Sequence, residues 1–160
     1  MIKTVIFILL GLLIGTLLFV GRRLFDDTHV TKAIILKPYN EVWAWLSEPN
    51  NYAKLYPKWV SKIERLERDK YLITSPHMSK TYKIRRVLNE EGGSIDIEIN
   101  LPNTSEPEIS RTRIMDIGKN RTAVIHLGSK WSGFNAFLWL LYTFNVDSDF
   151  HNAKKVIESS

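Results

Sequence analysis

The chain has 160 residues and no cysteine, and it carries a formal net charge of +5 at pH 7. Its length predicts one domain, and the lack of cysteine excludes thiolate metal sites and cysteine nucleophiles. The basic charge suits an anionic membrane surface rather than nucleic acid, for which a concentrated basic stripe or a known motif would be needed.

The first segment is an apolar run over residues 4–20 that contains no charge. As a helix it would measure about 26 Å, enough for a thin bilayer. A cleaved secretory signal would need small residues before the cleavage point, and the stretch Phe19 to Arg23 lacks them. We therefore expect one retained transmembrane helix over residues 1–23, followed by a linker over residues 24–29.

The orientation of that helix follows from its basic flanks. Only Lys3 precedes the run, whereas Arg22, Arg23, Lys32 and Lys37 follow it. Because basic loops stay on the cytoplasmic side, we predict a single-pass membrane protein whose C-terminal domain is cytoplasmic.

The rest of the chain alternates strand and helix signals. Branched residues predict a strand over residues 30–36, which Lys37-Pro38 ends, and a short helix follows over residues 39–47. Strand-like runs then lie at residues 60–66, 71–74, 80–88, 94–101, 109–117 and 122–130, and the pattern turns helical from Gly133. This order predicts an α+β domain with a mostly antiparallel sheet and a covering terminal helix.

Four segments together carry a family resemblance: Ile34 to Ser47, which contains Pro38-Tyr39-Asn40-Glu41-Val42-Trp43, then Asn50-Asn51-Tyr52, Tyr56-Pro57-Lys58-Trp59-Val60 and Asp149-Phe150-His151-Asn152-Ala153-Lys154. They resemble the START-like (SRPBCC) superfamily of helix-grip proteins, which includes polyketide cyclase/dehydrase-like and lipid-transport domains. The resemblance implies a helix-grip domain over residues 30–160, in which a curved sheet of about six to seven strands grips a long C-terminal helix. It also implies an apolar cavity between the two.

A membrane-anchored binding module for an apolar ligand is the function that this resemblance implies, the ligand being a lipid, a quinone-like or a polyketide-like molecule. Two other functions stay open, a cyclase or aromatase-type enzyme and a scaffold domain whose cavity is filled by its own side chains. The four histidines show no metal-ligand spacing, and no nucleophile or nucleotide motif is present. We therefore name no catalytic residue, metal or cofactor, and the expected partners are membrane lipids and the apolar ligand.

Strand alternation indicates which side chains face the cavity. Ile97 shares a face with its apolar neighbours on one strand, and Tyr82 shares a face with Arg86 on another. A two-residue turn at Lys119-Asn120 would pair Ile114 with Ile125 and Thr112 with Leu127, turning all four inward together with Ser110. The predicted ligand-binding residues are Tyr82, Arg86, Ile97, Thr112, Ile125, Phe137 and Leu141.

Arg86 has two interpretations. An unpaired inward guanidinium could bind a ligand carboxylate or phosphate, whereas the alternatives are a buried ion pair, a position at the sheet rim, or a bulge that reverses the alternation. On the opposite face, Lys83, Arg85, Arg111 and Arg113 flank Asp96 and Glu98, which predicts either an ion-pair ladder or a basic patch for anionic lipid.

The terminal helix carries more apolar residues than one face can hold. Phe134, Phe137, Leu138 and Leu141 share one helical face and are predicted to pack on the sheet. Trp139 and Tyr142 then lie elsewhere, either as core under a neighbouring loop or at a lipid surface beside the cavity mouth.

Overall fold

The structure is a computed structural model that describes residues 2–76, 80–100, 106–130 and 136–160. Its helices are α1 (Ile2–Phe25), α2 (Tyr39–Ser47), the 3-10 helix η1 (Pro49–Asn51), α3 (Tyr52–Leu55) and α4 (Ala136–Glu158). Its strands are β1 (Thr28–Ile35), β2 (Lys62–Glu67), β3 (Lys70–Ser75), β4 (Lys80–Asn89), β5 (Ser94–Asn100), β6 (Glu108–Asp116) and β7 (Thr122–Ser129).

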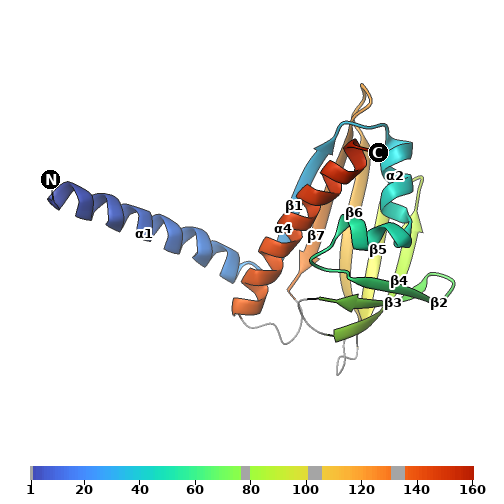
Figure 1. The fold of residues 1–160 in the computed structure, drawn as a ribbon, viewed down its shortest axis with the longest axis horizontal. Coiled ribbons are helices and arrows are strands. Elements are labelled where there is room, and N and C mark those ends of the chain that lie inside the picture. Colours follow the sequence, from blue (N-terminus) through green and yellow to red (C-terminus); the bar gives the residue numbers. More distant parts are fainter. Residues whose placement is uncertain (1, 77–79, 101–105, 131–135) are drawn as a thin grey trace.

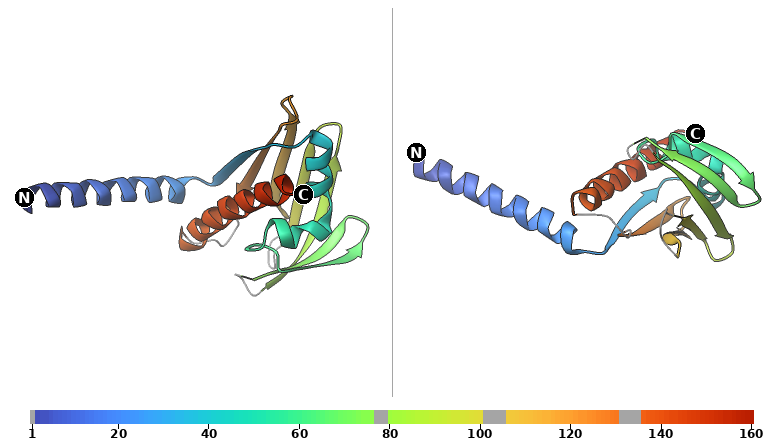
Figure 2. Two further views of the ribbon diagram at one scale, coloured as in Figure 1. Left: turned by 45° about the horizontal axis from the view of Figure 1, so that its top comes forward. Right: turned by 90° about the horizontal axis from the view of Figure 1, so that it is seen from below.

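The strands form one seven-stranded antiparallel sheet in the order β1-β7-β6-β5-β4-β3-β2. Helices α2, α3 and α4 lie along it (Figures 1 and 2). Side chains from α2 and α4 share one core cluster with inward residues of β1, β5, β6 and β7, so these helices cover the same face. The predicted α+β class, the antiparallel sheet and the long terminal helix are confirmed.

The register of β6 on β7 differs from the prediction by one residue. Ile114 pairs with Val124 and Thr112 with His126, because the loop holds three residues, Gly118 to Asn120, all with positive φ. The bond from the Ile117 N–H to the Arg121 carbonyl closes this loop at 3.1 Å. A shift of one residue moves every side chain of a strand to the other face.

The predicted inward position of Ile125 is therefore wrong. Ile125 pairs with Arg113 on the outer face, and His126 takes an inward position beside Thr112. The pairing of Thr112 with Leu127 is wrong for the same reason, whereas the inward positions of Thr112 and Ser110 are confirmed, since both are buried.

The outer face carries the predicted ion-pair ladder. Arg85 donates to Glu98 at 2.6 Å and 2.7 Å, and Arg113 donates to Asp96 at 2.5 Å. The hydrogen bonds from Arg85 hold the pKa of Glu98 below its usual range. These contacts neutralise both acids against the neighbouring strands.

Helix α4 buries a different face from the predicted one. Phe137 is 71% exposed and Leu141 is 40% exposed, while Phe134 lies outside the described residues. The buried residues of α4 are Trp139, Tyr142, Thr143, Asp149, Phe150, Ala153 and Ile157. Because Trp139 and Tyr142 are core residues, the predicted contact of either with lipid is wrong.

A glycine on β7 makes this arrangement possible. A Cβ atom at Gly128 would lie 2.3 Å from the Tyr142 hydroxyl oxygen, so only glycine lets the ring come so close to the strand. Trp139 then stacks on Tyr142, with ring centroids 5.2 Å apart and an interplanar angle of 14°. Trp139 and Tyr142 thus face the sheet, and the more apolar helical face that carries Phe137 and Leu141 does not.

Helix α1 extends away from the rest of the chain (Figures 1 and 2). The large apolar side chains between Val5 and Leu18 are 49–72% exposed. Over the part of the chain that is described, the structure has no helix with the length and hydropathy needed to span a membrane. The predicted transmembrane anchor over residues 1–23 is not supported.

Candidate functional site

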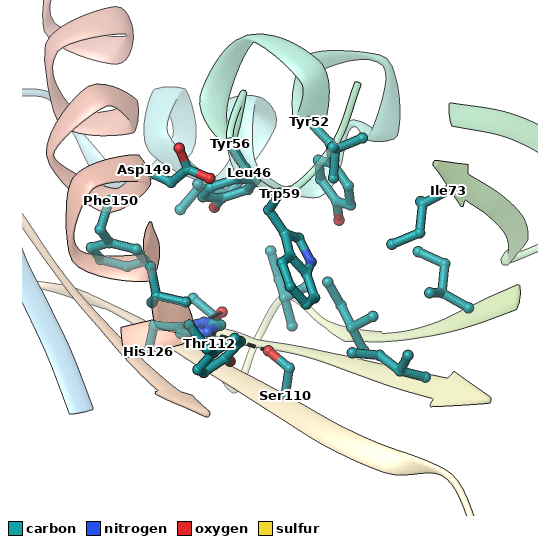
Figure 3. Close-up of a pocket in the computed structure, with 17 residues that line it drawn as sticks. Leu46, Tyr52, Tyr56, Trp59, Ile73, Ser110, Thr112, His126, Asp149 and Phe150 are labelled. Atoms are coloured by element: carbon teal, nitrogen blue, oxygen red, sulfur yellow. Dashed lines mark hydrogen bonds between the residues drawn. The ribbon is translucent and has the colours of Figure 1, made fainter. Parts of the chain in front are cut away.

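A cavity lies between the inner face of the sheet and helices α3 and α4 (Figure 3). It encloses about 70 Å³, well below the ~300 Å³ at which ordinary ligand pockets begin. Its lining consists of Leu46, Tyr52, Tyr56, Trp59, Val60, Ile73, Ile84, Ile95, Ile97, Ile99, Ser110, Thr112, His126, Tyr142, Val146, Asp149 and Phe150. Most of these side chains are aliphatic or aromatic, so the site favours apolar contents.

Trp59 occupies part of the space between the helices and the sheet. Trp59 lies in the turn after α3, where its backbone N–H donates to the Tyr56 carbonyl at 2.9 Å. Its indole points into the cavity (Figure 3). The indole meets the Tyr142 ring edge-on, with centroids 5.5 Å apart. Asp149 of α4 fixes the same turn, because its Oδ1 accepts the Lys58 N–H at 3.1 Å.

A polar cluster interrupts the apolar lining on β6 and β7. The Thr112 hydroxyl oxygen lies 3.0 Å from His126 Nδ1, and the Ser110 hydroxyl oxygen lies 3.4 Å from Nε2. Antiparallel pairing places Thr112 directly opposite His126, and Ser110 follows two residues away on the same face. Strand geometry alone therefore brings the two hydroxyls to the two ring nitrogens.

His126 is uncharged at neutral pH. Burial is the main cause that lowers its pKa to about 4, and the nearby His29 adds to the effect. Phe150 lies against the imidazole, with centroids 5.6 Å apart. A neutral imidazole has one donor and one acceptor nitrogen, so the cluster offers hydrogen bonds without a net charge.

The phenols around the cavity also stay uncharged. Burial raises the pKa values of Tyr56 and Tyr142, and it raises that of Tyr52 against the opposing effect of the Arg86 guanidinium. Within the described ranges, no group of three or more acidic, histidine or cysteine side chains could hold a metal ion. The arrangement suits binding by apolar contact and by a few neutral hydrogen bonds.

Arg86 is inward and buried, as the strand alternation predicts, but it is not among the residues that line the cavity. Its Nη1 donates to the Ser47 carbonyl, and its Nη2 donates to the Tyr71 hydroxyl at 3.0 Å. The guanidinium also lies 4.8 Å from the centroid of the Tyr71 ring and 3.8 Å from an Asp69 carboxylate oxygen. These contacts match the interpretation of a buried ion pair.

The structure places the predicted ligand-binding residues in four different locations. Ile97 and Thr112 line the cavity, while Tyr82 and Arg86 are buried outside its lining. Ile125 lies on the outer face of the sheet, and the side chains of Phe137 and Leu141 are exposed.

Four further residues line the cavity that were not among the predicted ligand-binding residues: Trp59, His126, Tyr142 and Asp149. For His126, the sequence does contain a signal, which is Gly118. A three-residue loop that includes this glycine shifts the register by one residue and turns His126 inward.

No family profile and no curated protein matches this sequence. Among solved structures, the protein XoxI from Bacillus cereus superposes with a TM-score of 0.68 at 14% identity, over 82% of this chain and 96% of that chain. The Zhui aromatase/cyclase from a Streptomyces species gives 0.65 at 17% identity, over 82% and 93%. The Aha1 dimer from Colwellia psychrerythraea gives 0.65 at 11% identity, over 83% and 97%. At these identities the similarity shows the fold, which is the helix-grip fold.

Burial of the neutral imidazole predicts a pH-dependent stability. An unfolded histidine titrates near ~6.5, whereas His126 in the folded protein titrates at about 4. The unfolded state therefore binds more protons between these values, and stability should fall by roughly 3 kcal/mol as the pH drops through this window. Urea unfolding at a series of pH values measures how the free energy of unfolding changes with pH.

The variant His126→Gln should lose this pH-dependent contribution, while His151→Gln, at an exposed position, should keep it. Equal slopes in parent and His126→Gln would contradict the assignment.

Proposed function

We propose that this protein binds an apolar small molecule in the cavity between the sheet and α4. The observation that carries the proposal is a mostly apolar lining that contains one polar cluster, formed by Ser110, Thr112 and His126. The helix-grip fold supports it, as does membership of the START-like superfamily, which we propose on the resemblance of residues 34–60. Lipid, quinone-like and polyketide-like molecules are the candidate classes.

The volume of about 70 Å³ is smaller than an ordinary ligand pocket and by itself favours a cavity filled by its own side chains, so the proposal requires a side chain to leave. Trp59 projects into the cavity from a turn rather than from a strand, and we propose that its indole is the group that a ligand displaces. An incoming apolar ligand would replace the contacts between this indole and Tyr142. If Trp59 never leaves, the cavity is filled by its own side chains and the domain is a scaffold.

A cyclase-type enzyme is the second candidate, and the convergence of His126 with two hydroxyls favours it. One of the structural neighbours is described as an aromatase/cyclase. A general base works best when its pKa lies near the working pH, and the pKa of His126 is lowered to about 4. The imidazole is thus a weak base at neutral pH, and we rank binding before catalysis.

Two isoleucine substitutions on opposite faces of the sheet test the binding site. Ile97→Phe would fill the cavity, whereas Ile125→Phe adds the same ring to the outer face. With the uncharged fluorophore phenylnaphthylamine, we expect saturable binding to the parent and to Ile125→Phe. The Ile97→Phe variant should bind at least about tenfold more weakly, a difference of ~1.4 kcal/mol. Thermal unfolding checks that both variants fold, and equal binding by all three proteins would refute the proposed site.

We further propose that α1 attaches the protein to membrane lipid on the cytoplasmic side. The supporting observation is the exposure of its apolar side chains, such as Phe7 at 72% and Leu18 at 70%. Apolar area left in water costs roughly 25 cal/mol per Å², so contact with lipid would be favourable. The following Arg22-Arg23 pair suits an anionic headgroup layer.

Lysines placed in α1 test this attachment. Leu9 and Leu13 are 60% and 56% exposed, so replacing both by lysine leaves the folded domain untouched. We expect the parent to float with vesicles of phosphatidylcholine and phosphatidylglycerol, and the double variant Leu9→Lys/Leu13→Lys to remain with the unbound protein. Thr81→Lys, which adds a charge to an exposed position on β4, is the control. Undiminished flotation of the double variant would contradict lipid attachment through α1.

A further inference from the structure

The charges of the cavity lining restrict what it can bind. Among the described residues that line it, there is no lysine and no arginine, and the one acidic side chain is Asp149. Asp149 is 3% exposed, and its Oδ1 accepts the Lys58 N–H. A carboxylate or phosphate inside this cavity would meet an acidic group and no cation, so its charge would stay uncompensated at a high desolvation cost.

The nearest buried cation does not change this balance. Arg86 is 7% exposed, and its guanidinium is engaged by the Ser47 carbonyl, the Tyr71 hydroxyl and, at 3.8 Å, Asp69. Turning it toward the cavity would break these hydrogen bonds in a buried place, where an unsatisfied polar group is costly. Both Nη atoms of Arg86 therefore join the end of α2 to β3 and β4, while its buried Nε has no hydrogen-bond partner among the described residues.

The polar cluster of Ser110, Thr112 and His126, in contrast, can form hydrogen bonds with an uncharged group of a ligand. Hydroxyls donate or accept as required, and the imidazole provides one donor and one acceptor. The Ser110 hydroxyl oxygen lies 3.4 Å from His126 Nε2, at the long end of the hydrogen-bond range, whereas Thr112 is held at 3.0 Å. Ser110 can thus turn its hydroxyl toward a ligand oxygen at little cost, while Thr112 fixes the ring.

We infer that the ligand is an uncharged apolar molecule with one hydrogen-bonding oxygen at the Ser110–His126 end of the cavity, that is, a ketone, quinone, phenol or alcohol rather than a fatty acid or a phosphate ester. This inference rests on the proposed binding function and narrows its ligand class. A fatty acid would place its carboxylate either beside Asp149 or in a cluster without positive charge. A carbonyl or hydroxyl oxygen would instead complete the hydrogen bonds of Ser110.

Three related probes test the inference: naphthalene, naphthol and naphthoate. Their fused ring is close in shape to the indole of Trp59, so each fits the space that this side chain would vacate. Equilibrium dialysis with the full chain at neutral pH measures their affinities, and only the binding that Ile97→Phe removes is counted, which excludes uptake by α1. We expect naphthol to bind about tenfold more tightly than naphthalene, and naphthoate to bind most weakly.

Variants of the polar cluster provide the second part of the test. Ser110→Ala and Thr112→Val should each bring the ratio of the naphthol affinity to the naphthalene affinity, measured in the same variant, most of the way from about ten to one. Thr81→Val, an exposed position on β4, should change neither. Naphthoate binding as tightly as naphthol, or an advantage of naphthol that survives in Ser110→Ala, would overturn the inference and leave the proposed function intact. If none of the probes binds in the cavity, the proposed function fails and the inference fails with it.

Discussion

The packing of α4 against the inner face of the sheet is the contact on which the rest of the structure depends. Towards its C-terminal end, Phe150, Ala153 and Ile157 join the core cluster of β1, β5, β6 and β7. A second cluster lies over β3, β4 and β5, and Tyr56 and Ile97 touch both. The cavity lies where the two clusters meet, because one straight helix cannot cover the whole of a curved seven-stranded sheet. Burial of each large apolar side chain around the cavity stabilises the folded state by roughly 1.5–3 kcal/mol. This packing keeps the lining in place although the space at its centre is incompletely filled.

The polar groups inside this apolar wall are compatible with it because they form hydrogen bonds while staying neutral. A charged imidazole at the position of His126 would be poorly solvated, and burial shifts its pKa accordingly. The hydroxyls of Thr112 and Ser110 satisfy the ring in either tautomer, so the cluster costs far less than an isolated polar group would. The buried charge of Arg86 is met separately, by Ser47, Tyr71 and Asp69 outside the cavity. The groups that compensate Arg86 thus lie outside the cavity, although its guanidinium also acts on the hydroxyl of the lining residue Tyr52.

Much of this architecture could be predicted from the sequence, because strand alternation, proline and glycine punctuation and local pairing are short-range signals. Parity alone predicted the buried face of β4 and placed Arg85, Arg113, Asp96 and Glu98 on one outer face, where the structure then pairs Arg85 with Glu98 and Arg113 with Asp96. The identity of the cavity residues did not, since a single residue in the loop before Arg121 decides whether Ile125 or His126 faces inward. The buried face of α4 was equally hidden: its apolar stripe through Phe137 and Leu141 is exposed, and Tyr142 is selected by the space above Gly128. Such complementarity belongs to the tertiary structure and leaves no periodic signal.

The central claim is that the incompletely filled region between the sheet and α4 is a binding site. A crystal structure of the full chain grown with excess naphthol tests it most directly. We expect the naphthyl ring between β5, β6 and α4, its hydroxyl beside Ser110 and His126, and the Trp59 indole moved out of the cavity. An unchanged Trp59, with naphthol absent from the cavity or bound only on the outer surface, would contradict the account and leave a domain whose interior is filled by its own side chains.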